Sequence, residues 1–277
     1  MWAALAVSAV LTAAPADVGA LQIKNDRFTY GVYGQARTDT QVLPGEIVFV
    51  AFDVDGLQTR DDGTASYTTS LELLDKDNKS LFKETPVERK ALLPMGGNHL
   101  PNWSQVIVGS DTEPGTYTVR VTVADKLAKN GQPAVLEKKF ELTAPHFGLI
   151  RTALFYDKPP ASPPPAPPVA VPGQGFIVGF TAVGFQTNPG AKAGDQAQAH
   201  VLVEMTIRDE TGKPTLAKPF VIDVNQGLAE DYKAALPFSF PLAPNRAGKY
   251  TLVITATDKL ANKSAKQELS LTVVEPK

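Results

Sequence analysis

The sequence contains no cysteine in its 277 residues. Disulfide bonds, thiolate metal sites, a cysteine nucleophile and a lipidated N-terminal cysteine are therefore excluded. Histidine is almost as scarce: only His99, His146 and His200 are present, and no two of them have the spacing of a metal-binding motif. The fingerprints of dinucleotide, nucleoside-triphosphate and serine-hydrolase sites are missing as well. We expect no cofactor and no enzyme; a hydrolase with an unrecognised site is the alternative, because catalytic triads are defined by geometry rather than by spacing.

An excess of positive charge is also lacking. The chain has 27 Lys and Arg against 29 Asp and Glu, a formal net charge of -2. This balance supplies no positive field that would hold nucleic acid or an anionic membrane surface. We therefore expect no nucleic-acid partner.

Long apolar runs are absent beyond the first residues. Residues 2–14 form an apolar run with the length of a secretory signal peptide, too short to cross a bilayer core of about 30 Å as a helix. Small-x-small cleavage sites end at Ala16 and Ala20, although no Lys or Arg precedes the run. The sequence predicts a signal peptide over residues 1–20 and an exported protein (periplasmic, cell-surface or secreted) without a membrane span after its removal. An uncleaved anchor or a buried segment is the alternative.

The sequence does contain the same phrases twice. Residues 44–59 align without a gap on residues 172–187, and the later stretch "PGTYTVRVTVADKLA" matches "AGKYTLVITATDKLA". Because the order and approximate spacing of the matches are kept, they predict an internal duplication. The first module is expected at residues 21–145 and the second at residues 146–277.

Inside each module the apolar residues alternate with a period of two. Val48, Val50 and Phe52 fall on one face of a strand, and Phe176, Val178 and Phe180 are their counterparts. This pattern is typical of half-buried antiparallel strands, and turn signals such as "PGE" and "DETGK" separate them. The sequence therefore predicts an all-β fold of two tandem antiparallel β-sandwiches.

The glycine turn followed by Tyr117 or Tyr250 resembles the F strand of immunoglobulin-like sandwiches, and fibronectin type III and PKD modules carry a similar phrase. The resemblance implies an immunoglobulin-like fold in which each tyrosine hydroxyl bonds back to the backbone. The cysteine pair and the core tryptophan of antibody domains are missing. The duplicated pattern also resembles exported bacterial proteins of unknown function.

The repeated "DKLA" follows that strand directly. We interpret it as a hairpin turn in which Asp125 and Asp258 accept backbone hydrogen bonds and the lysines point to water. A duplicated catalytic Asp–Lys pair is the alternative.

A proline-rich arm occupies residues 157–172. Because residues 140–145 match the last strand of the chain, residues 147–156 are expected to open the second module, ahead of the arm. Its composition predicts a stiff polyproline II segment, either a docking segment or a rigid surface loop.

If the first module has immunoglobulin topology, residues 55–66, 92–103 and 124–134 form three loops at one pole. Trp103 suits a binding anchor there, or alternatively it starts a strand and is buried in the core. Acidic residues at the same pole suggest a calcium site, or alternatively a solvated acidic loop. The predicted binding residues are Asn98, His99, Asn102 and Trp103, with Asp61 and Asp62 at the rim. The calcium candidates are Asp55, Asp61, Asp62 and Asp125.

The sequence as a whole predicts an exported, non-catalytic binding or spacer protein. Its partner is expected to be a protein or a cell-surface glycan. A pair of carbohydrate-binding modules is the alternative, although a sugar platform normally needs more than one exposed aromatic side chain.

Overall fold

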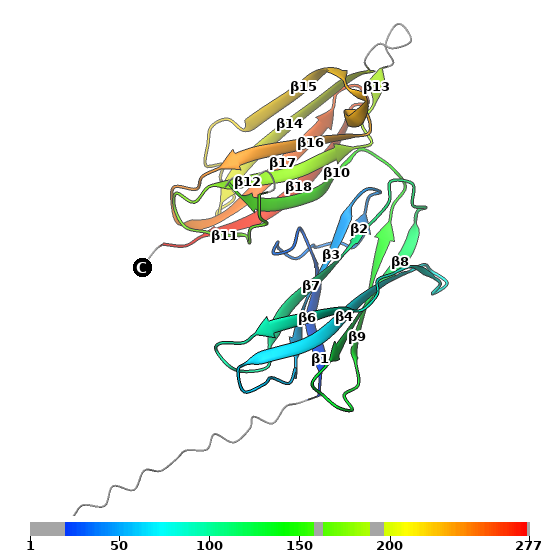
Figure 1. Ribbon diagram of the computed structural model, residues 1–277. Coiled ribbons are helices and arrows are strands. Elements are labelled where there is room, and N and C mark those ends of the chain that lie inside the picture. The colour runs from blue at the N-terminus through cyan, green and yellow to red at the C-terminus, as the bar shows by residue number, and fades with distance from the viewer. Residues whose placement is uncertain (1–19, 158–162, 189–196, 276–277) are drawn as a thin grey trace, which may run out of the picture.

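The computed structural model describes residues 20–157, 163–188 and 197–275. Within these ranges every named element is a β-strand, except for one short 3₁₀ helix, η1 (Glu230–Tyr232). The prediction of an all-β fold is confirmed. Residues 1–19 of the predicted signal peptide lie outside the described residues. The strands form two bodies, one from residues 20–145 and one from residues 146–275, which we call the first half and the second half (Figure 1).

Two sheets face one another in the first half. The smaller sheet contains, in order, β1 (Gln22–Thr29), β3 (Ile47–Asp55) and β7 (Leu100–Ile107). The larger sheet contains, in order, β2 (Gln41–Val42), β9 (Ala134–Leu142), β8 (Gly115–Asp125), β4 (Thr64–Leu74) and β5 (Ser80–Lys83), with β6 (Val87–Leu92) also paired to β4. The strand pairs are antiparallel except β2–β9, which is parallel.

The second half has a closely similar strand order. Its smaller sheet contains β10 (Gly148–Tyr156), β12 (Phe176–Val183) and β16 (Ala235–Leu242). Its larger sheet contains β11 (Val169–Ala170), β18 (Lys263–Val273), β17 (Gly248–Asp258), β14 (Ala197–Asp209) and β13 (Thr187–Asn188), with β15 (Phe220–Leu228) paired to β14. Here the short parallel pair is β11–β18. In each half, therefore, a two-residue strand near the start runs parallel to the last strand.

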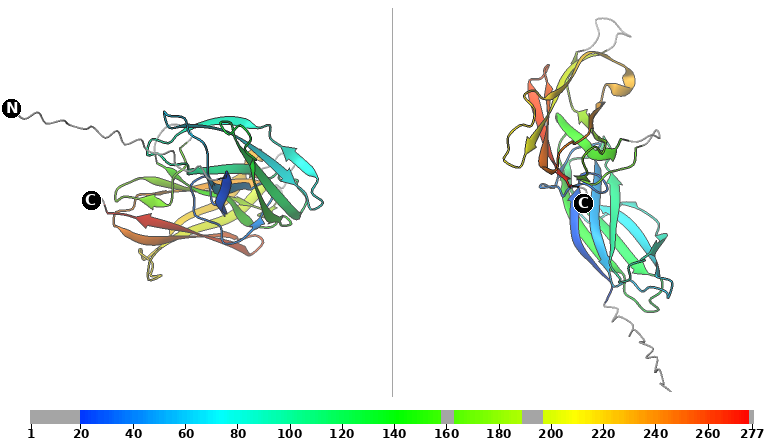
Figure 2. Two further views of the ribbon diagram at one scale, coloured as in Figure 1. Left: turned by 90° about the horizontal axis from the view of Figure 1, so that it is seen from below. Right: turned by 90° about the vertical axis from the view of Figure 1, so that its left-hand side faces the viewer.

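Figure 2 shows the sheets of the two halves from two further directions. Each half has its own hydrophobic core between its sheets. The residues that alternate in the sequence point inward as expected: Val48, Val50 and Phe52 are each 1% exposed, and Phe176 and Val178 are fully buried. Burial of one face of each strand is the main stabilising contribution in a sandwich of this kind.

The proline-rich arm connects the two sheets of the second half. β10 precedes it, as predicted. The amide of Ala166 donates to the carbonyl of Leu154 (2.8 Å), and the amide of Tyr156 donates to the carbonyl of Pro164 (3.0 Å). The arm then enters β11, where the amides of Thr272 and Val274 donate to the carbonyls of Pro168 and Ala170 (2.9 and 2.8 Å). Residues 158–162 of the arm lie outside the described residues.

Both tyrosines of the repeated phrase make the hydrogen bond that the resemblance implies. The hydroxyl of Tyr117 donates to the carbonyl of Glu113 (2.6 Å), and the hydroxyl of Tyr250 donates to the carbonyl of Arg246 (3.0 Å). Each bond connects the start of a central strand to the loop before it.

The structure confirms that the aspartates of "DKLA" accept backbone hydrogen bonds. Asp125 accepts from the amide of Leu127 (2.8 Å), and Asp258 accepts from the amide of Leu260 (2.9 Å). Each also accepts from a distant loop, from the amide of Gln58 or of Gln186 (both 2.7 Å). The repeated aspartate therefore joins two loops at one end of each sandwich.

The junction between the halves is polar and tightly bonded. Glu46 is 5% exposed, and its Oε1 accepts from the amides of Ile47 (2.9 Å) and Arg151 (2.7 Å). Its Oε2 lies 3.5 Å from the guanidinium of Arg37. On the other side of the junction, the amide group of Gln35 bonds the backbone of Glu268 and Ser270 on β18. These bonds connect the first half to the second half across the junction.

Candidate binding groove

The three predicted loops do lie at the same end of the first half, away from the second half (Figure 1). The amide of Leu93 donates to the carbonyl of Gly63 (3.0 Å), and Gln58 reaches Asp125 as described above. These bonds connect the loop after β3, the loop before β7 and the loop after β8. This part of the predicted pole is confirmed.

The polar residues predicted at the pole mostly bind their own neighbours. Nδ1 of His99 lies 2.6 Å from Oδ1 of Asp55, while the ammonium of Lys24 lies 2.9 Å from Oδ2. The hydrogen bond from Lys24, followed by that from His99, lowers the pKa of Asp55. Oδ1 of Asp62 accepts from the amide of Thr64 (2.9 Å), which lowers the pKa of Asp62. The carboxylates are thus used in local ion pairs and turns.

The calcium candidates Asp55, Asp61, Asp62 and Asp125 do not fit a cation site. In the part of the chain that the structure describes, no three His, Asp or Glu side chains gather in a group that could hold a metal ion. Asp55 has a cationic partner, and both oxygens of Asp125 accept backbone amides. Calcium needs several free carboxylate or carbonyl oxygens that converge.

Asn102 and Trp103 lie in β7, not in the loop where the sequence placed them. β7 begins at Leu100, which pairs with Val54 of β3. The amide of Asn102 points into the sandwich and donates to the hydroxyl of Tyr67 (3.2 Å). The alternation of a strand then turns Trp103 outward, where it is 37% exposed and its ring lies 6.3 Å from that of Phe49. Trp103 is therefore neither a loop residue nor a core residue.

The predicted binding patch consequently divides into separate parts. Asn98, His99, Asp61 and Asp62 stay at the pole, where His99 and the two aspartates are exposed and Asn98 is half-buried. Asn102 joins the two sheets from inside. Trp103 belongs to a different surface, the outer face of the sheet β1–β3–β7.

A groove of about 290 Å³ lies on that outer face. Its floor is Ala51, which is 7% exposed. The strand register places Arg27 of β1 on one side of Ala51 and Trp103 of β7 on the other. A small residue between two large ones leaves a hollow, and the aromatic ring forms one wall of it.

A loop between β1 and β2 lines one end of the groove. Tyr33 on this loop is 56% exposed and lines the groove together with Val32 and with Pro167 of the proline-rich arm. The loop is held in place by a bond from the amide of Tyr30 to the carbonyl of Gln35 (3.0 Å). The groove therefore has two exposed aromatic side chains.

The polar side chains of the groove are oriented by Asn25. This residue has a left-handed backbone (φ 52°) at a bulge in β1. Its amide donates to Oδ2 of Asp53 (2.7 Å), and its carbonyl accepts from Arg27 (2.8 Å). An anionic and a cationic group are thus fixed beside an aromatic wall, an arrangement that can bind a ring with one apolar face and polar edges.

The corresponding place in the second half is filled by the chain itself. The register there aligns Ala153, Gly179 and Ser239, so a glycine replaces the floor alanine and a serine replaces Trp103. The ring of Phe155 lies over Gly179, only 3.0 Å from where a Cβ would be. The aromatic groove is therefore a feature of the first half.

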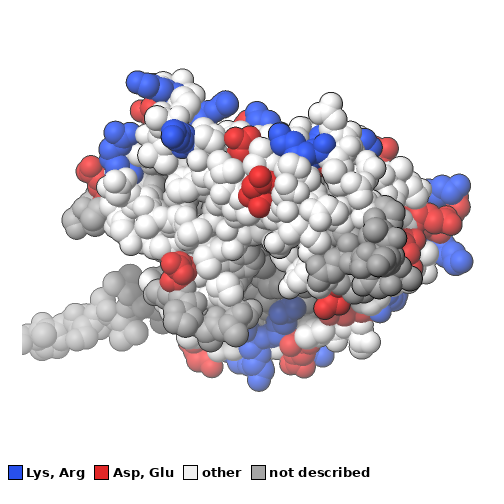
Figure 3. Space-filling model, turned by 90° about the horizontal axis from the view of Figure 1, so that it is seen from above, with Lys and Arg blue, Asp and Glu red and all other residues white. Residues whose placement is uncertain are grey.

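Charge is mixed rather than gathered into a field. Figure 3 shows Lys and Arg interspersed with Asp and Glu on the described residues of the face seen from above. Among the described residues, the structure contains no helix long and apolar enough to span a bilayer.

No family model and no curated protein sequence match the chain. Among solved structures, the C-terminal domain of the AgI/II polypeptide BspA of Streptococcus agalactiae aligns at 10% identity over 91% of this chain and 100% of that one, with a TM-score of 0.29. The C-terminal domain of the antigen I/II-family protein AspA of Streptococcus pyogenes aligns at 10% identity over 92% and 100%, with a TM-score of 0.31. Red sea bream transglutaminase aligns at 12% identity over 94% of this chain, with a TM-score of 0.28, and the chain spans 32% of its length. Likenesses at these scores support no statement about function.

Sequence reasoning missed Arg27, Ala51 and Tyr33. Arg27 and Ala51 could be recognised as groove residues only from the register of β1, β3 and β7, which is known once these strands are paired. The second aromatic residue, Tyr33, lies in a segment between two strands that carries no repeat counterpart in the alignment.

Proposed function

We propose that this protein is an exported, non-catalytic binding protein built from two immunoglobulin-like modules, residues 21–145 and 146–277. The signal-like N-terminus supports export. The shared strand order, the two tyrosine hydrogen bonds and the repeated phrases support immunoglobulin-like modules that arose by duplication.

The ligand site in this proposal is the groove beside Trp103, and its ligand is a carbohydrate. The observation that carries the proposal is the exposed ring of Trp103 next to the hollow over Ala51, with Tyr33 as a second exposed aromatic. A pyranose ring has an apolar face of C–H groups that packs against an aromatic ring, and hydroxyls at its edge that bond to charged side chains. Arg27 and Asp53 line the same groove and offer a donor and an acceptor to such hydroxyls.

A binding role rather than a reaction is supported by how the charged side chains are used. Asp53 and Arg27 are both held by Asn25, and the repeated Asp of "DKLA" binds backbone amides. The bonded junction at Glu46 and Gln35 supports a second property, that of a spacer which presents the groove in a fixed orientation.

Glycan-array binding by the mature protein tests this proposal, with Trp103→Ala as the test variant. If the ring is an anchor, its loss weakens binding by about 2 kcal/mol, or roughly 30-fold. Ile107→Ala is the matched control, because Ile107 is 64% exposed on the same strand and does not line the groove. Equal glycan binding by wild type and Trp103→Ala would end the carbohydrate proposal, as would an array without a bound glycan.

Export is tested by N-terminal sequencing of the protein from its native host. A mature start near Asp17 or Leu21 supports it. Retention of Met1 in a cytosolic fraction contradicts it.

A further inference from the structure

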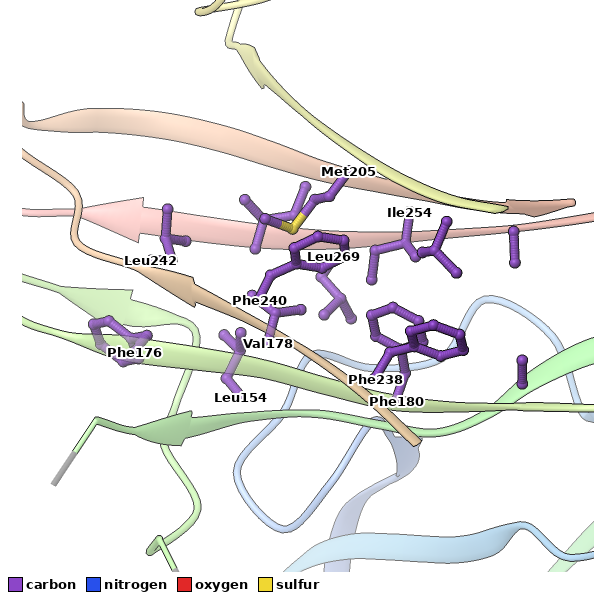
Figure 4. Close-up of a cluster of buried hydrophobic side chains, with 14 of the residues drawn as sticks. Leu154, Phe176, Val178, Phe180, Met205, Phe238, Phe240, Leu242, Ile254 and Leu269 are labelled. Carbon is purple, nitrogen blue, oxygen red and sulfur yellow. The ribbon is translucent and has the colours of Figure 1, made fainter. Parts of the chain in front are cut away.

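A second groove, of about 570 Å³, opens at one end of the second half. It lies between the edge strands of the two sheets: Phe220 begins β15 on one side, and Leu242 ends β16 on the other. At its base are Leu252 and Leu271, which are 0% and 2% exposed. The groove therefore reaches the buried core, and Figure 4 shows Leu242 at one end of that core, away from the stacked rings of Phe180 and Phe238.

A comparison of the two halves explains why this space is open. In the first half, Phe140 lies opposite Tyr117 in the strand register, and the two rings stack at 5.7 Å. In the second half, Leu271 lies opposite Tyr250. The smaller side chain leaves the tyrosine half-buried, whereas Tyr117 is 8% exposed. The second half thus lacks an aromatic ring at the place where the first half is filled by one.

The rim of the groove includes large exposed apolar side chains. Leu216 is 51% exposed and Phe220 is 37% exposed, and both line it. Exposed large apolar side chains beside an open path to the core favour a ligand that is itself apolar over most of its length.

The edge of β16 disfavours an extended peptide as the occupant. Pro237 and Pro241 pair in register with Thr181 and Ile177 of β12. Because proline has no N–H group, the free edge of β16 lacks a donor at both positions. An edge that has lost two donors in this way is a poor template for the addition of another strand. We therefore expect side-chain contacts, more than strand pairing along β16, to hold the occupant.

A cationic group lies at the mouth of the groove. Arg246 is exposed and lines the groove, and its Nε donates to the hydroxyl of Tyr250 at 3.4 Å. The acidic group that interacts with it electrostatically is Asp209, whose Oδ1 is bound by the amides of Thr211 and Lys213. Because Arg246 is exposed, its guanidinium can also be reached by an anionic head group at the mouth of the groove.

We propose that this groove binds a single-chain carboxylate amphiphile, with its acyl chain between the sheets and its carboxylate at Arg246. The volume falls within the range of small-ligand sites, about 300–1,000 Å³. A narrow, flexible chain fits the passage between two edge strands, and a free fatty acid places its single charge at the end that meets the arginine.

Isothermal titration of the full mature chain with octanoate, decanoate and dodecanoate tests the proposal. Each added methylene that is buried should strengthen binding by about fourfold. Leu271→Phe copies the first half and should abolish binding while keeping the melting temperature. Arg246→Gln should weaken dodecanoate binding severalfold and leave binding of dodecanol unchanged.

The control is Val221→Ala, since Val221 is 53% exposed next to Phe220 but does not line the groove, and it should bind dodecanoate as wild type does. Leu216→Glu adds a negative charge at the exposed rim without touching the core, so it should weaken binding even if Leu271→Phe fails to fold. Affinity that is independent of chain length overturns the proposal, and so does unchanged binding by both the Leu271→Phe and the Leu216→Glu variants.

Discussion

Replacement of Asp258 by alanine should destabilise the second half selectively. Asp258 is fully buried and accepts from three backbone amides, those of Gln186, Leu260 and Ala261, at 2.7, 2.9 and 3.1 Å. A hydrogen bond to a charged group contributes about 1.5–3 kcal/mol to stability. Because these donors lie in loops that water reaches once the side chain is gone, we expect a total loss of about 3 kcal/mol. For a unit of this size that is a decrease of about 10 °C in melting temperature.

Two probes separate the halves in one urea titration. The sequence has two tryptophans, and removal of the predicted signal peptide leaves Trp103 alone, so its fluorescence reports the first half. Far-ultraviolet circular dichroism reports both halves. Asp258→Ala should move part of the dichroism transition and leave the fluorescence transition in place, whereas Asp125→Ala should move the fluorescence transition. The reasoning is refuted if Asp258→Ala changes neither signal, or if it shifts fluorescence as much as dichroism.

Three further predictions concern Glu46 at the junction, the hydroxyls of Tyr117 and Tyr250, and the unfolding of each half on its own. Burial raises the pKa of Glu46, so the folded state takes up a proton at a higher pH than the unfolded state does. The stability that proton uptake by Glu46 contributes is therefore lost as pH rises through the folded-state pKa. The stability of the Glu46→Gln variant relative to wild type should therefore increase as pH rises from about 4 to about 8, measured by urea midpoints. A stability difference that stays constant over this range would contradict the prediction. Tyr117→Phe should cost about 1 kcal/mol and Tyr250→Phe less, because the bond of Tyr117 is shorter and more buried, and calorimetry that ranks them the other way would be evidence against this. Fragments 21–145 and 146–277 should each unfold cooperatively, and a fragment without a thermal transition would show that its core needs the other half.

Much of the fold could be predicted from local sequence. The alternation of Val48, Val50 and Phe52 has a period that only a strand can bury on one face, and the turn residues between such runs mark where strands end. The role of Asp125 was half predictable: its bond to Leu127 is local, but its bond to Gln58 joins segments whose proximity depends on the whole sandwich.

The binding surface was predictable only in part. Pro101 suggests a loop, but β7 is an edge strand, and proline is compatible with such an edge, so the strand extends further toward the pole than expected. That shift takes Trp103 out of the loop and onto the face of the sheet. The groove beside it also depends on the bulge at Asn25, which decides which residue of β1 stands opposite Ala51. No local pattern encodes that register.

The short parallel strands have a mechanical consequence. In each half the chain enters and leaves at opposite ends of the sandwich (Figure 1). Tension between those ends pulls β2 and β9 along their own axes in opposite directions, and it does the same to β11 and β18. The amides of Glu141 and Thr143, bonded to the carbonyls of Thr40 and Val42, are then loaded side by side in shear, as are their counterparts on β18. Paired bonds loaded in this way must rupture together instead of unzipping one after the other, so a stretched chain meets the same resistance twice along its length.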